Sequence, residues 1–88
     1  MDTRVAVIAI IVENPAMVEE INHELHAYAD YVIGRMGIPY REKNISIISV
    51  AVEAPQSVIS ALSGKLGRLE GVSAKAAYSN CTYPEESL

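Results

Sequence analysis

The sequence predicts an α+β domain of order βαββαβ, with a four-stranded antiparallel sheet and two helices on one of its faces. Two runs of residues are aliphatic almost throughout, and a proline precedes each of two helical patterns. The other extended segments have the glycine, proline and lysine content of edge strands. With 88 residues, half of them hydrophobic and a fifth charged, the chain can form one small folded domain.

The first strand and the first helix are predicted from residues 5–32. Every residue from 5 to 12 is Val, Ile or Ala, so both faces of this strand are apolar and it should lie in the centre of the sheet. Asn14 and Pro15 then provide a capping side chain and a proline at the first helical position. A helix is therefore expected to begin here, with an apolar stripe at Val18, Ile21, Leu25, Tyr28 and Val32.

The second and third strands differ in composition. Residues 32–40 include Gly34, Gly37 and Pro39, which suit an edge strand and disfavour a central one. A polar break at residues 41–44 precedes an aliphatic run at residues 45–52, which only serines interrupt. This pattern predicts a hairpin from an edge strand into a second central strand.

The second helix and the last strand complete the order. Pro55 stands at the predicted start of a helix whose apolar residues share one side and which ends near residues 67–71. Residues 72–78, which include Lys75, are predicted to form the other edge strand. Residues 80–88 show no periodicity, so we expect a domain at residues 1–79 and a disordered tail after it.

Right-handed crossovers place these strands in the spatial order 4-1-3-2, the ferredoxin-like arrangement, with both helices on one face. The other face then has no cover, and the apolar side chains expected on it are Val5, Val7, Ala9, Ile11, Ile45 and Ile47. Burial of roughly 600 Å² there would contribute on the order of 15 kcal/mol before association costs. We therefore expect a second copy to cover this face, in a homodimer or a tetramer, in preference to the alternative that the polar segment after Ser79 folds over it.

Charge and cysteine content exclude several function classes. Seven Lys and Arg against eleven Asp and Glu give a net charge of −4, which disfavours direct binding to nucleic acid. The single Cys81 allows no intrachain disulfide, no CxxC pair and no Cys/His zinc spacing. The apolar run at residues 5–12 is too short to span a membrane, and Asp2 precedes it where a signal peptide would be positive. A soluble cytoplasmic protein is therefore expected.

Few residues of the sequence suggest a catalytic, metal-binding or ligand-binding role. We find no nucleophile with a base, no phosphate loop and no carboxylate pair outside a solvated helix face, so we expect neither an enzyme nor a cofactor. His23 and His26 share one side of the first helix and could ligate a divalent metal, although a solvated helix face explains them as well. Gly64 and Gly67 interrupt the second helix at a cost of about 1 kcal/mol each relative to alanine. A close backbone approach would explain them, either from packing within the chain and a helix cap, or from a ligand or partner.

Two stretches of the sequence resemble a known family. They are Gly37-Ile38-Pro39-Tyr40-Arg41-Glu42-Lys43-Asn44 and Ala61-Leu62-Ser63-Gly64-Lys65-Leu66-Gly67, the second followed by Gly71-Val72. Over residues 4–78 the chain resembles the small iron-only hydrogenase system regulators. The resemblance implies an ACT-like ferredoxin fold, similar also to the C-terminal sensing domain of nickel-responsive repressors. It also implies an association with hydrogenase or its maturation.

The resemblance further implies a binding site. ACT-type domains usually bind an amino acid or another small effector near the loop between the first strand and the first helix, at a subunit interface. Here Asn14, Pro15 and Ala16 occupy that loop, with Ala16 where the pattern has glycine.

These inferences together predict a non-enzymatic, oligomeric regulatory domain that binds a small effector or a partner protein at a subunit interface. Asn14, Pro15 and Ala16 would form one wall of the site, and Gly64 with Gly67 would offer backbone contacts. The alternatives are a divalent-metal sensor that uses His23 and His26, or a purely structural protein-interaction module.

Overall fold

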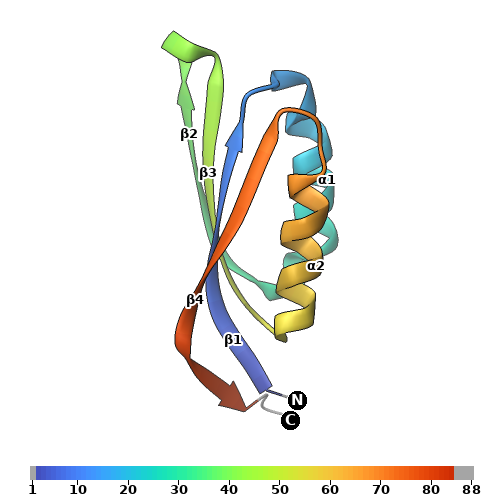
Figure 1. Cartoon of the computed structure of the whole chain (residues 1–88), viewed down its shortest axis with the longest axis vertical. Helices are drawn as coiled ribbons and strands as arrows, with labels where there is room; N and C mark the ends of the chain where they lie inside the picture. The colour runs from blue at the N-terminus through green and yellow to red at the C-terminus, as the bar shows by residue number, and fades with distance from the viewer. Residues whose placement is uncertain (1, 85–88) are drawn as a thin grey trace.

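The structure, a computed structural model, describes residues 2–84 (Figure 1). Its main elements are β1 (Asp2–Val12), α1 (Val18–Ala27), β2 (Val32–Tyr40), β3 (Ile45–Ala54), α2 (Gln56–Gly67) and β4 (Val72–Pro84). Short 3-10 helices lie between them: η1 (Pro15–Met17), η2 (Ala29–Tyr31) and η3 (Arg41–Lys43). The predicted βαββαβ order is therefore confirmed.

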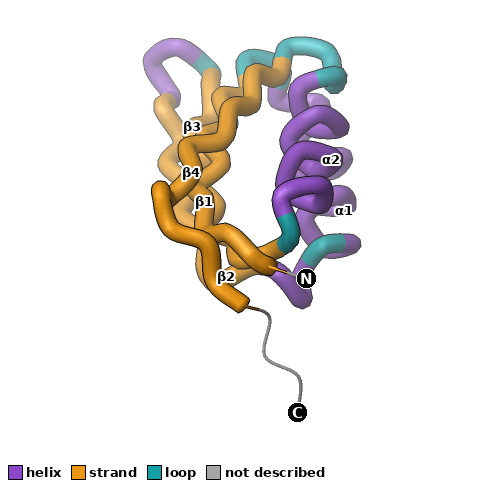
Figure 2. Tube along the Cα trace, turned by 60° about the horizontal axis from the view of Figure 1, so that its bottom comes forward, coloured by secondary structure: helices purple, strands orange, loops and turns teal. Residues whose placement is uncertain are grey.

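The four strands form one antiparallel sheet in the order β2-β3-β1-β4, which is the predicted 4-1-3-2 order seen from the other edge. The two aliphatic runs occupy the central strands β1 and β3, as their composition requires. Both helices lie on one side of the sheet, and the other side is left without helices (Figure 2). This ferredoxin-like arrangement decides which side chains are available for binding.

The core lies between the sheet and the two helices. Alternate residues of the central strands are buried against the helices, because successive side chains of a strand point to opposite faces. The buried strand residues are Ala6, Ile8, Ile10 and Val12 of β1 and Ile48, Val50, Val52 and Ala54 of β3. The helices contribute Ile21, Leu25, Ile59, Leu62 and Leu66 to the same core. No helix within residues 2–84 is long and apolar enough to cross a membrane.

The start of the first helix differs from the prediction. The side-chain oxygen of Asn14 accepts a hydrogen bond from the Ala16 amide at 3.1 Å, but this cap begins the 3-10 helix η1, and α1 follows only at Val18. The end differs too, because α1 stops at Ala27 and η2 turns the chain into β2. Val32, predicted to belong to the helical stripe, therefore packs against the core from β2.

The last strand is longer than predicted. We expected a tail from residue 80, but residues 80–84 continue β4, and Thr82 to Pro84 pair with the first residues of β1. The register between the two strands shifts between Arg4 and Ala6. Such an irregularity breaks the alternation of side chains, which removes the sequence signal of a strand. The remaining part of the expected tail, residues 85–88, lies outside the described residues.

Candidate functional site

The helix-free face of the sheet carries large apolar side chains in contact with solvent. Val7 and Ile11 of β1 and Ile47 of β3 are each about 40% exposed, and they occupy the face opposite the core. Of the other residues predicted for this face, Ala9 is exposed, and Val5 and Ile45 are half-buried. The structure thus places the predicted interface residues of both central strands on one surface, with no helix over them (Figure 2).

Strand β2 extends this apolar surface, which the sequence analysis missed. Met36 pairs with Ser49, Ile38 with Ile47 and Tyr40 with Ile45, so their side chains share the helix-free face. Ile38 is 53% exposed and Met36 62%. The alternation of apolar residues at 36, 38 and 40 was the available signal. We call the set Val7, Ile11, Met36, Ile38, Tyr40 and Ile47 the bare face.

The loop between β1 and α1 lies beside the β2–β3 turn. Pro15 lines a hollow of about 110 Å³ together with Tyr40, Arg41 and Asn44. On its other side the loop is joined to the α2–β4 turn, because the Glu13 amide donates a 2.7 Å hydrogen bond to the Gly71 carbonyl. The predicted effector loop is therefore held at one end of the sheet, next to one edge of the bare face.

Comparison with known proteins places this architecture in a family. Residues 4–76 match the family model TM1266-like, described as "Iron-only hydrogenase system regulator, putative". The chain belongs to this family. Among solved structures, the uncharacterized protein TM1266 from Thermotoga maritima is 32% identical, with a TM-score of 0.82. That match covers 86% of this chain and 96% of the other.

The family assignment confirms the resemblance found in the sequence. The TM1266-like family is described as a regulator of the iron-only hydrogenase system, not as an enzyme. A search of the curated proteins finds no match to this chain. The family match includes the β1–α1 loop and the whole bare face, whereas Thr3 and the end of β4 lie beyond it.

The two helix glycines are not explained by packing within the described chain. A Cβ atom on Gly64 would meet only the Arg68 side chain, at 4.0 Å, and one on Gly67 would meet nothing within 4 Å. Gly67 is the last residue of α2. It lines a hollow with Ile11 and Val72, whereas Pro15 lines a different one. Pro15 of the β1–α1 loop and Gly67 therefore line two separate hollows and do not form the single site that the sequence predicted.

The histidines of α1 lie apart from other metal-ligating groups. His23 and His26 are both exposed, and residues 2–84 contain no group of three or more His, Cys, Asp or Glu that could hold a metal ion. His26 instead lines a groove of about 310 Å³ between α1 and β2, together with Asn22 and Arg35. Cys81 is a free, exposed thiol on β4.

Proposed function

We propose that this member of the TM1266-like family is a non-enzymatic, homo-oligomeric regulatory domain. In this proposal a second copy covers the bare face, and a small effector or partner protein binds at the subunit interface. The observation that carries the proposal is the bare face itself, a helix-free surface on which large apolar side chains of β1, β2 and β3 are about 40–60% exposed.

Burial of the bare face in a dimer is energetically feasible. Burial of apolar surface contributes about 25 cal/mol per Å², so a patch of roughly 600 Å² contributes on the order of 15 kcal/mol. Association costs an estimated 4–15 kcal/mol, so a face of this kind can support a stable dimer. A two-fold axis brings the same surface of two chains together, and the apolar character of each then matches the other.

The small hollow beside Pro15 suggests why an effector site would need the interface. Its volume of about 110 Å³ is well below the roughly 300–1,000 Å³ of ligand pockets, so a bound small molecule would need walls from a second chain. Tyr40 belongs to this hollow and to the bare face. An effector in contact with Tyr40 would therefore favour one arrangement of the interface over another, which is the requirement for regulation.

Native mass spectrometry of the purified chain tests the assembly. We expect a dimer or a tetramer, and we expect Val7→Lys and Ile38→Lys to dissociate it, because each places a charge within the buried apolar patch. The matched control is Ala61→Lys, since Ala61 is an exposed residue of α2. A wild-type chain that stays monomeric at high concentration would overturn the proposal.

A thermal-shift screen tests the effector. Amino acids and nucleotides at millimolar concentration are the probes, and one that binds only the folded protein raises the unfolding temperature. Tyr40→Ala should abolish such a shift. An assembly that forms without any stabilising small molecule or partner would indicate a purely structural interaction module instead.

A further inference from the structure

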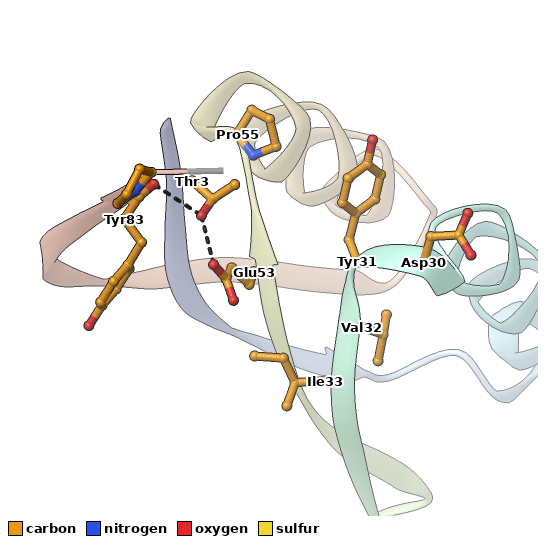
Figure 3. A pocket seen from close by; sticks show the side chains of 9 residues that line it. Thr3, Asp30, Tyr31, Val32, Ile33, Glu53, Pro55 and Tyr83 are labelled. Carbon is orange, nitrogen blue, oxygen red and sulfur yellow. Dashed lines mark hydrogen bonds between the residues drawn. The ribbon is translucent and has the colours of Figure 1, made fainter. Parts of the chain in front are cut away.

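A hollow larger than the one beside Pro15 lies at the end of the sheet opposite the β1–α1 loop (Figure 3). Its volume is about 660 Å³, within the range of small-molecule sites. Three separate parts of the chain build it: the paired ends of β1 and β4, the turn from η2 into β2, and the junction of β3 with α2. Tyr83 and Pro84 line the hollow because β4 continues as far as Pro84.

The charged side chains that line this hollow are all acidic. Asp30 and Glu53 contribute carboxylates, and none of the nine described residues that line the hollow is Lys, Arg or His. The buried Thr3 hydroxyl lies 2.7 Å from Glu53 Oε2 and donates a hydrogen bond to it, with the Tyr83 carbonyl oxygen at 3.3 Å. This bond orients the exposed Glu53 carboxylate at the wall of the hollow, and a carboxylate can accept further hydrogen bonds from a ligand.

Aromatic rings lie on both sides of this carboxylate. Figure 3 shows Tyr31 and Tyr83 on either side of Glu53, and their side chains are 37% and 42% exposed. Ile33, 63% exposed, adds apolar surface, and the buried Pro55 also lines the hollow. An aromatic face attracts a cation electrostatically, and a fixed carboxylate accepts charge-assisted hydrogen bonds from an ammonium or guanidinium group.

We propose that this hollow binds a small organic cation, a primary amine or guanidinium carried on a short aliphatic stem. Glu53 pairs with the charged group, the face of a tyrosine ring contacts the same group, and Ile33 contacts the stem. This site is separate from the effector loop of the proposed function and does not depend on it. Three of its lining residues, Thr3, Tyr83 and Pro84, lie outside the residues that match the family, and the other six lie within them.

Agmatine and n-butylamine are suitable probes, with n-butanol as an uncharged counterpart of similar shape. Each is titrated into the full chain at constant ionic strength while backbone amide shifts are recorded by NMR. We expect both cations to shift the amides of residues around Thr3, Tyr31 and Glu53, and butanol to shift none of them. Absence of shifts there, or equal shifts with butanol, would overturn the proposal.

Glu53→Gln supplies the decisive variant, because it removes the charge and keeps an acceptor for the Thr3 hydroxyl. Agmatine should bind this variant at least tenfold more weakly than the wild type. The matched control is Glu13→Gln, an exposed carboxylate at the other end of β1, which should leave the affinity unchanged. Equal weakening by both variants would show nonspecific attraction to a negative protein, and no weakening by Glu53→Gln would show that the carboxylate is not the anchor.

The NMR spectrum of Glu53→Gln also shows whether this variant is folded. A Glu53→Gln spectrum that matches the wild type away from the hollow shows an intact fold. Should that spectrum change throughout, Tyr83→Leu provides the second variant, since it keeps the apolar bulk and removes the aromatic face. Agmatine affinity that Tyr83→Leu leaves unchanged would then count against the site.

Discussion

Gly71 and Asn14 lie so close together that residue 71 has no room for a side chain. A Cβ atom on Gly71 would lie 2.7 Å from Asn14 Cβ and 3.2 Å from its backbone nitrogen. Gly71 also has a φ of +73°, a left-handed conformation that other residues adopt at a cost. The contact holds the β1–α1 loop against the α2–β4 turn.

Gly71→Ala should therefore destabilise the chain by about 1–3 kcal/mol, from backbone strain and from the displaced loop. Thermal unfolding measures this loss, and each kcal/mol lowers Tm by roughly 4–8 °C in a domain of this size. Amide shifts of residues 13–17 should change as well. A variant as stable as the wild type would contradict the close contact.

Gly64→Ala should have the opposite effect on the isolated domain. Its new methyl group meets only Arg68 Nη2, at 4.0 Å, and alanine is the better helix former by about 1 kcal/mol. We expect Tm to rise. If a ligand or partner contacts this backbone, the same variant should weaken that binding while the fold is more stable. A lower Tm when Gly64→Ala is added to Val7→Lys, the variant expected to be monomeric, would contradict the open space at this position.

Arg4 should stabilise the irregular part of β4. Its guanidinium donates to the Ser79 carbonyl at 2.7 Å and to Gln56 Oε1 at 3.2 Å, and lies 4.5 Å from the centre of the Tyr78 ring. Arg4→Met should cost about 1–3 kcal/mol, since it removes charge-assisted hydrogen bonds and a cation–π contact. Hydrogen exchange at residues 79–84 should become faster. Arg35→Met, on the exposed edge strand β2, is the control and should leave that exchange unchanged.

A chain truncated after Ser79 tests the two proposed sites independently of each other. It loses the pairing of Thr82 and Tyr83 with β1 and a wall of the larger hollow, but it keeps the bare face. We expect a lower Tm and no agmatine binding, whereas native mass spectrometry should still find the wild-type oligomer. Loss of assembly in a folded truncated chain would show that the end of β4 takes part in the interface.

The histidines of α1 give a further prediction. Two exposed imidazoles without a third ligand should bind Ni²⁺ or Zn²⁺ only weakly, because structural sites for such ions usually have four ligands. Thermal unfolding of the wild type and of His23→Ala with equimolar metal should therefore show no difference. Stabilisation of the wild type alone would favour the metal-sensor alternative.

The amino-acid sequence by itself determined the element order and the central strands. Residues 5–12 and 45–52 carry apolar side chains on both faces, a composition typical of the central strands of a sheet. These two aliphatic runs also predicted an exposed apolar face, since the two helices cover only one side of the sheet. The family was also evident from local motifs, and the match over residues 4–76 confirms it.

Only the tertiary structure decided which neighbours complete the two candidate sites. Met36, Ile38 and Tyr40 join the bare face through the register of β2 against β3, and a shift of one residue would point them to the other side. The irregular pairing near Arg4 carries β4 on to Pro84 and brings Tyr83 to Thr3. The alternation at residues 36, 38 and 40 indicates that these side chains share a face, but the register that decides which face, and the irregularity in β4, depend on contacts between residues far apart in the chain.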